Sequence, residues 1–141
     1  AAAEYAKRLS RFCKLDILEL PEERLPENPS PAQVEAALSK EADAVRAKLP
    51  ASCLLIAMCV EGKERSSEEL ARYLADSAAQ GASHIVFLIG SSFGMHESLK
   101  RQAALRLSMS PMTFPHHLLR VMLLEQIYRA YQINAGSRYH K

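Results

Sequence analysis

Two short apolar runs without alternation constrain the fold of this chain more than any other feature. They cover residues 53–60 (CLLIAMCV) and 84–89 (HIVFLI). A strand with one face in water alternates apolar and polar residues, so these continuous runs predict strands buried on both faces, as in a parallel sheet. Between the runs, Ser66 and Glu69 are spaced as a helix start, and Gly81 marks a helix end. The pattern predicts a βαβ unit with a right-handed crossover.

Further helices are predicted on both sides of this unit. Residues 1–12 carry an apolar stripe at helical spacing, and Ser30-Pro31 begins a helix that should run to about Leu49. We also expect a short strand at 15–20, a proline-rich loop at 21–31, a short helix at 98–107 and a long helix at 116–134. These elements predict one α/β domain over residues 1–141, with a parallel-rich sheet flanked by helices.

Composition narrows the class of protein. The chain has 141 residues, of which 48% are hydrophobic, which is enough for the core of one domain. No apolar run reaches the roughly 18–20 residues that cross a bilayer, and no secretory signal is visible. The three cysteines, Cys13, Cys53 and Cys59, lie in or beside apolar segments, which is typical of reduced thiols. We therefore expect a cytoplasmic protein that is not in a membrane.

The small formal net charge of +2 hides an asymmetry along the chain. Residues 1–94 carry a net charge of −3, and residues 95–141 a net charge of +5. A basic C-terminal third is typical of a surface that attracts a polyanion. The alternative, that these charges lie by chance on solvated helix faces, stays open at this point.

The segment after the second predicted strand is a candidate binding site. A turn from Gly90 to Gly94 follows the carboxyl end of that strand, where α/β proteins bind ligands, although such a turn taken alone is more often a plain turn. Further on, residues 108–115 form a loop with two prolines that is unusually apolar. His116 and His117 have no partners at zinc spacing, so we expect no metal site. Ser91 and Ser92 lack an evident base, which argues against a serine nucleophile.

The last predicted helix, residues 116–134, is apolar on nearly all sides. Such a helix must be buried on several sides, either at the centre of the domain or against a second subunit. We favour the second subunit, because a small sheet already flanked by helices has little room for another enclosed helix. The sequence thus predicts a homodimer.

Three stretches taken together are more specific than any one of them. They are Phe87-Leu88-Ile89-Gly90 with Gly94, residues 107–116 (LSMSPMTFPH), and Arg120 with residues 125–130 (EQIYRA) and the ending Tyr139-His140-Lys141. The chain closely resembles the RlmH family of SPOUT-class methyltransferases over essentially its whole length. The resemblance implies an α/β fold with a C-terminal trefoil knot. It also implies a homodimer that uses S-adenosyl-L-methionine to methylate N3 of a pseudouridine in large-subunit (23S) ribosomal RNA on the assembled ribosome.

The resemblance also implies a cofactor pocket. By position, this pocket would be lined by Met58, Gly90, Met109, Ser110, Pro111, Met112, Thr113 and Phe114. Family members begin with a strand and a Gly-Lys turn ahead of the position of Ala1, so we expect the sheet of this chain to lack that strand.

Given this activity, a base must remove the imide proton of pseudouridine. The candidates are His140 and Tyr139 in the C-terminal tail, with Arg129 and Arg120 stabilising the developing negative oxygen or a phosphate. Contacts to RNA are expected from Arg138, Lys141 and His116. The alternative is a non-catalytic rRNA-binding α/β dimer module, which is favoured by Ser91 standing where the family usually has a glycine.

Overall fold

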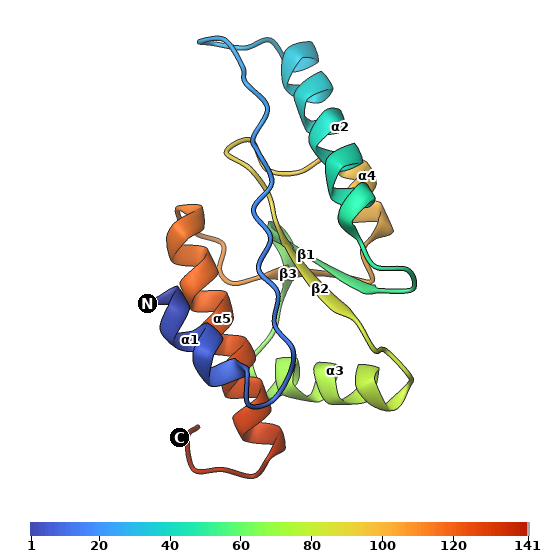
Figure 1. Cartoon of the computed structure of the whole chain (residues 1–141). Helices are drawn as coiled ribbons and strands as arrows, with labels where there is room; N and C mark the ends of the chain where they lie inside the picture. Colours follow the sequence, from blue (N-terminus) through green and yellow to red (C-terminus); the bar gives the residue numbers. More distant parts are fainter. Residues whose placement is uncertain (141) are drawn as a thin grey trace.

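The computed structural model describes residues 1–140, so the RNA-contact prediction for Lys141 lies outside the described residues. The helices and strands, in chain order, are α1 (Ala2–Leu9), α2 (Pro31–Lys48), β1 (Leu54–Glu64), α3 (Ser67–Ala79), β2 (Ile85–Ile89), α4 (Glu97–Gln102), β3 (Leu105–Ser108) and α5 (His116–Asn134). The strands form a three-stranded sheet in the order β2-β1-β3, and both pairings are parallel (Figure 1). The predicted α/β class with a parallel sheet flanked by helices is confirmed.

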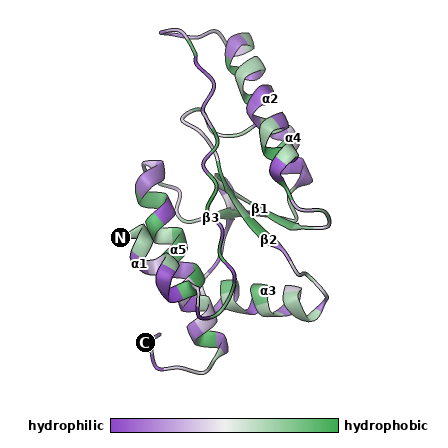
Figure 2. Cartoon of the chain, viewed as in Figure 1, coloured by the Kyte–Doolittle hydropathy of each residue, from purple (hydrophilic) through white to green (hydrophobic). Residues whose placement is uncertain are grey.

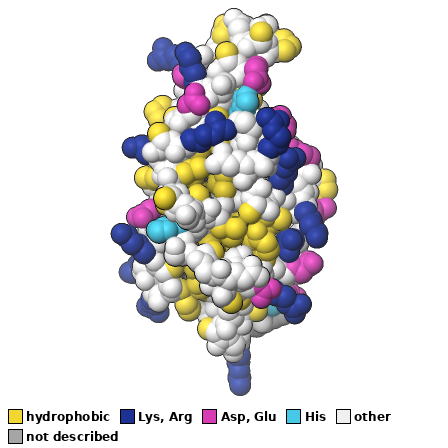
Figure 3. Space-filling view, turned by 90° about the vertical axis from the view of Figure 1, so that its right-hand side faces the viewer, with side chains coloured by type: hydrophobic (Ala, Val, Ile, Leu, Met, Phe, Trp, Pro, Cys, Tyr) yellow, Lys and Arg dark blue, Asp and Glu magenta, His cyan; other side chains and the backbone are white. Residues whose placement is uncertain are grey.

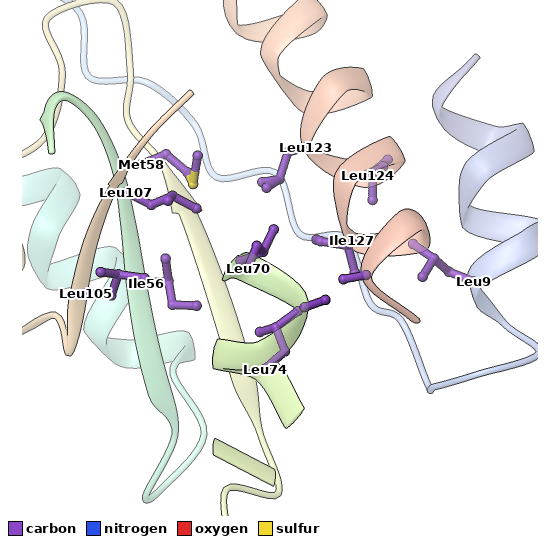
Figure 4. Packing of buried hydrophobic residues seen from close by; sticks show 12 residues of the cluster. Leu9, Ile56, Met58, Leu70, Leu74, Leu105, Leu107, Leu123, Leu124 and Ile127 are labelled. Carbon is purple, nitrogen blue, oxygen red and sulfur yellow. The ribbon is translucent and has the colours of Figure 1, made fainter. Parts of the chain in front are cut away.

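Helices cover both faces of the sheet. On one face, Ile56 and Met58 of β1 pack into a core with α1, α3 and α5, in which Leu9 is completely buried (Figure 4). On the other face, Ala57 packs with residues of α2 and α4, including Leu99. Successive residues of a strand point to opposite faces, so the continuous run in β1 supplies both cores. The hydropathy colouring shows the same distribution, with β1 and β2 strongly hydrophobic (Figure 2).

The helix starts follow from local chemistry. The side chains of Ser30 and Ser66 each accept a hydrogen bond from the backbone N–H three residues on. The side chains of Gln33 and Glu69 accept a second hydrogen bond, from the backbone N–H of the capping serine. These are complete capping boxes, as predicted for α2 and α3, and each stabilises a helix start by about 1 kcal/mol.

Two predictions about secondary structure are wrong. Residues 15–20 are extended but belong to no strand, because no neighbouring strand lies beside them to complete the backbone hydrogen bonds. The short helix ends at Gln102, and Leu105–Ser108 forms β3 instead of continuing it. The strand state of β3 comes from pairing with β1, which a run of four residues does not reveal by itself.

Strand β2 differs from its predicted burial. All five of its residues are only half-buried, because β2 lies at the edge of the sheet. Beside it is a groove of about 1160 Å³, lined mainly by β2, the extended segment 13–22, α2, α3 and α5. The α5 residues that line it include the candidates His116 and Arg120. In the space-filling view, apolar side chains gather at the middle of the face between α2 and α3 (Figure 3). The edge of β2 is therefore an open apolar surface.

Candidate functional site

The sheet register places the predicted cofactor residues side by side at one end of the three strands. Met58 of β1 pairs with Ile89 of β2 and with Leu107 of β3. Gly90 follows Ile89 directly, and Met109 comes two residues after Leu107. Neighbouring strands are separated by about 4.8 Å, so the Gly90 turn and the Met109 loop begin within about 10 Å of each other. Both lie at the carboxyl edge of the sheet, where α/β proteins bind ligands.

The turn after β2 is closed and requires glycine. Ser91 and Gly94 exchange two backbone hydrogen bonds, of 2.9 and 2.8 Å. A Cβ placed on Gly90 would lie 2.6 Å from the carbonyl carbon and oxygen of Gly94, which is closer than real contacts allow. Gly94 itself has a φ of +89°, a conformation that L side chains rarely adopt. The backbone therefore folds tightly at the end of β2.

Acidic side chains from the amino-terminal half hold this turn. The Ser91 hydroxyl donates to Glu41 Oε1 at 2.7 Å, and the Ser92 backbone N–H donates to Glu22. The Ser92 hydroxyl donates to Glu22 as well, and the two hydrogen bonds from Ser92 keep the pKa of Glu22 below its usual range. Ser91 therefore has a structural partner of its own, which a glycine at this position would lack.

The loop between β3 and α5 offers free backbone groups. Its half-buried members are Met109, Ser110 and Phe114, whereas Pro111, Met112 and Thr113 are exposed. The Ser110 hydroxyl accepts a hydrogen bond from the Met112 N–H at 3.1 Å, which shapes the loop. Outside helices and strands, no backbone–backbone hydrogen bond of residues 1–140 involves residues 109–114. The Ser110 carbonyl accepts from the Ser108 hydroxyl at 2.9 Å. The remaining unpaired amides and carbonyls beside apolar side chains suit the recognition of a nucleoside.

The groove beside β2 reaches Gly90 but is not lined by residues 109–114. A smaller cavity of about 280 Å³ lies over Ser91, Ser92 and Phe93, and that loop does not line it either. The cofactor candidates are therefore adjacent at the sheet edge without enclosing one of these two cavities.

The end of α5 explains where the tail goes. Gly136 has a φ of +74°, and the Ser137 N–H donates to the Gln132 carbonyl at 3.0 Å. This is the Schellman arrangement, which ends a helix and reverses the chain. The tail therefore folds back along α5, as Figure 1 shows at the C-terminal end.

The folded-back tail brings three of the four catalytic candidates together. Glu125 of α5 is the centre: it accepts from the Tyr139 hydroxyl at 2.6 Å and from Arg129 Nε at 2.8 Å. The Arg129 guanidinium also lies 4.9 Å from the centre of the Tyr139 ring. Arg129 Nη1 is 3.0 Å from His140 Nδ1. Tyr139, His140 and Arg129 thus form one cluster around a carboxylate.

The partners of His140 determine its tautomer. Arginine only donates hydrogen bonds, so Nδ1 must accept from Arg129, and the ring proton lies on Nε2. Nε2 then donates to Glu68 Oε1 at 3.1 Å. Both ring nitrogens are occupied in this arrangement, so Nδ1 must be released from Arg129 before His140 can accept a proton from a substrate.

Tyr139 has a different character. The hydrogen bond to Glu125 and, to a smaller extent, burial raise the pKa of Tyr139 to about 12. Its phenol therefore stays protonated at neutral pH and is a hydrogen-bond donor, which makes it a weaker candidate for the base than His140. Glu125 likewise raises the pKa of Arg129 above its ordinary value, so that guanidinium stays charged.

Two of the other candidates lie apart from this cluster. Arg120 is nine residues before Arg129 on α5, roughly 13 Å along the axis, and pairs with Glu19 of the extended segment. His116 is exposed at the start of α5 and packs edge-on against His117. Arg138 is exposed in the tail, directly before Tyr139. The structure therefore separates Arg120 and His116, but not Arg138, from His140.

Sequence reasoning missed two members of the cluster. The i,i+4 spacing of Glu125 and Arg129 indicated an ion pair, but nothing indicated that Glu125 also receives the Tyr139 hydroxyl. Glu68 lies 72 residues from His140, and no local pattern in the sequence connects the two. Within residues 1–140, no group of three or more His, Cys, Asp or Glu side chains is arranged to hold a metal ion. No helix in this part of the chain is long and apolar enough to cross a membrane.

Comparisons with known proteins agree with this geometry. A family model described as predicted SPOUT methyltransferase matches residues 1–140. The ribosomal RNA large subunit methyltransferase H of Streptococcus suis is 46% identical over 139 residues, which are 99% of this chain and 87% of that protein. Proteins of the same name from Clostridioides difficile and Bifidobacterium adolescentis are 47% and 46% identical, over 98% and 100% of this chain and 87% and 89% of their own lengths. The chain belongs to the SPOUT methyltransferase family.

Proposed function

We propose that this protein is a ribosomal RNA methyltransferase that uses S-adenosyl-L-methionine to methylate N3 of a pseudouridine in 23S ribosomal RNA. The observation that carries the proposal is the register in which Met58 lies between the Gly90 turn and the Met109 loop. The relatives named above, which share nearly half of the residues of this chain, support an RNA substrate of the large ribosomal subunit. We take the assembled ribosome in the cytoplasm as the substrate.

The residues at the sheet edge fit the cofactor. Gly90 lets the backbone approach closely, and the unpaired backbone groups of residues 109–114 provide donors and acceptors for a nucleoside. Met58, which is only 6% exposed, lies between them on the central strand β1. When bound, S-adenosylmethionine supplies a methyl group that its sulfonium already activates, so the protein needs to position that group and exclude water.

The tail cluster provides the proton chemistry. The imide N3–H of pseudouridine must lose its proton, and His140 is the base once one of its nitrogens is released. Arg129 stays cationic beside it and stabilises the negative charge that develops on the neighbouring carbonyl oxygens. Tyr139 remains protonated and acts as a donor that holds Glu125 in place.

One copy of the chain places these two groups far apart. The Met109 loop ends where α5 begins, whereas the tail cluster surrounds Glu125 and Arg129. At 1.5 Å per residue, Arg129 is roughly 20 Å along the helix from His116. A base must come within hydrogen-bond reach of the proton that it removes. We therefore propose a homodimer in which the tail of one copy reaches the cofactor residues of the other.

The exposed apolar side chains support this homodimer. Leu118 of α5 is 49% exposed and Met112 of the loop is 70% exposed, both at the amino-terminal end of α5. Burying them against a second α5 in an antiparallel arrangement would bring the partner's tail to this end. Because these side chains are already partly buried, covering the exposed remainder of the two would contribute about 2–4 kcal/mol.

Methyl transfer tests the proposal directly. The purified chain is incubated with S-adenosylmethionine carrying a labelled methyl group and with ribosomes from a strain that lacks the modification. We expect label in one 23S position and loss of transfer in His140→Ala, with cofactor affinity unchanged in calorimetry. A chain that binds these ribosomes but neither binds the cofactor nor transfers label is the non-catalytic module instead.

Mixed dimers test the shared site. A Gly90→Val chain, defective in the cofactor turn, is mixed with a His140→Ala chain, defective in the tail. If the site combines two copies, the mixture regains up to about a quarter of the wild-type activity, because half of the dimers are mixed and each has one intact site. No recovery, in a mixture shown by mass spectrometry to contain mixed dimers, would refute the shared site.

A further inference from the structure

The first fourteen residues carry positive charge that the overall balance conceals. Lys7, Arg8, Arg11 and Lys14 stand against Glu4 alone, which gives this segment a net charge of +3, whereas residues 15–94 have a net charge of −6. Helix α1 packs directly against α5, so the basic amino-terminal segment lies beside the helix that carries Arg120 and Arg129 (Figure 1).

The basic side chains share one face of α1 and the helical turn that follows. At 100° per residue, Lys7 and Arg11 fall on one stripe of α1 and the turn after it, and Tyr5, Leu9 and Phe12 fall on the other. Leu9 is completely buried, so the basic stripe faces solvent. Lys7 and Arg11 are exposed, and neither forms an ion pair with any residue of the described chain 1–140. They are free cations with no structural partner there.

Aromatic side chains connect this face to the tail cluster. Arg8 lies at the border of the two stripes, with its guanidinium 5.7 Å from the Tyr5 ring and 5.9 Å from the Tyr128 ring. Tyr128 in turn packs edge-on against Tyr139 at 5.0 Å. Phe12 stacks on Tyr131 with 5.5 Å between ring centres, yet remains 37% exposed. Arg8, which also pairs with Glu4 at 3.2 Å, is therefore connected through Tyr128 to Tyr139.

We propose that this α1 face, consisting of Lys7, Arg8, Arg11 and Phe12, is a docking surface for a single-stranded RNA loop. Free cations bind phosphates, and a half-exposed ring accepts a stacked base, which is how unpaired RNA is recognised. Charge complementarity favours RNA over a second copy of this chain, because two such faces would repel. The inference rests on the proposed function, since the loop is the one that presents its nucleotide to the tail.

The test uses two matched double variants of the full chain. Lys7→Gln with Arg11→Gln removes the free cations of the α1 face, and Lys40→Gln with Lys48→Gln removes two exposed cations of α2. The probe is a fluorescein-labelled RNA stem–loop with an unpaired loop, titrated at several salt concentrations. We expect the α1 variant to bind about tenfold more weakly, with a salt slope smaller by about two. The α2 variant should bind as the wild type does.

Equal binding by both double variants would overturn the proposal. Phe12→Leu provides a second measurement: we expect RNA affinity to fall about tenfold with an unchanged salt slope, because stacking involves no phosphate. If Phe12→Leu instead alters the oligomeric state and leaves RNA binding intact, the face is an interface between copies and the proposal is wrong. Circular dichroism checks that each variant is folded. Stem–loop binding requires no methyl transfer, so this result is independent of the proposed activity.

Discussion

The ionisation of Tyr139 provides a sharp test of the tail arrangement. Its hydroxyl donates to Glu125 at 2.6 Å, and this bond is the largest cause of a pKa of about 12, against an ordinary 10. At pH 11, a phenol with a pKa of 12 is about 10% ionised, whereas an ordinary tyrosine is about 90% ionised. The ionised fraction of a docked Tyr139 and that of an ordinary tyrosine therefore differ most near pH 11, midway between the two pKa values.

Replacing the carboxylate should remove most of this difference. In Glu125→Gln, the negative charge that disfavours phenolate is gone, so the pKa of Tyr139 should fall toward 10 and its ionised fraction at pH 11 should rise severalfold. The assay is carbon-13 NMR of labelled tyrosine rings, with Tyr139→Phe to assign the signal and circular dichroism to confirm the fold at pH 11. Glu97→Gln, an exposed carboxylate on α4, is the matched control.

The raised pKa of Tyr139 also determines how the stability of the folded chain changes with pH. Because the pKa is raised in the folded chain, the contribution of this bond is fully present below pH 10 and is lost as the pH rises toward about 12. If Tyr139 of the wild type is mostly ionised at pH 11 while the chain remains folded, the tail does not dock on Glu125, and the reasoning about His140 fails with it.

Three further substitutions should change stability, each measured by urea unfolding. Gly90→Ala should lower the free energy of unfolding by about 1–3 kcal/mol, because its Cβ meets the Gly94 carbonyl at 2.6 Å; an unchanged stability would contradict the tight turn. Leu9→Ala should cost about 2–5 kcal/mol, because Leu9 is completely buried between α1 and the main core, and a cost below 1 kcal/mol would mean that α1 is not docked. Ser66→Ala should cost about 1 kcal/mol through loss of the α3 cap, and Ser66→Asp should restore most of it.

Local chemistry predicted those elements whose signals lie within a few residues. The capping boxes located the starts of α2 and α3, and the run in β1 gave its burial on both faces. Strand β3 was missed because its four residues become a strand only through pairing with β1. The same dependence explains the error at residues 15–20, which have the composition of a strand and no adjacent strand to pair with.

The open edge of β2 lies across a groove from the residues that were wrongly predicted to form a strand. The groove of about 1160 Å³ separates part of segment 13–22 from the half-buried residues of β2. An unpaired strand edge is one that sheet proteins seldom leave exposed. The family's first strand and the knot both stay predictions.

For the candidate site too, local patterns predicted the parts next to strands but not the arrangement of the C-terminal tail. The glycine turn and the loop after β3 are consecutive with strands, so their position at the carboxyl edge followed from the parallel sheet. The proton chemistry instead depends on a chain reversal at Gly136, whose glycine predicts the end of a helix but not the direction of the residues beyond it. That direction sets the partners of His140, since only a tail folded back along α5 can reach both Arg129 and Glu68. Because those two contacts occupy both ring nitrogens, the tail is in a closed form, and catalysis by His140 requires RNA, or the second copy, to displace Arg129 from Nδ1.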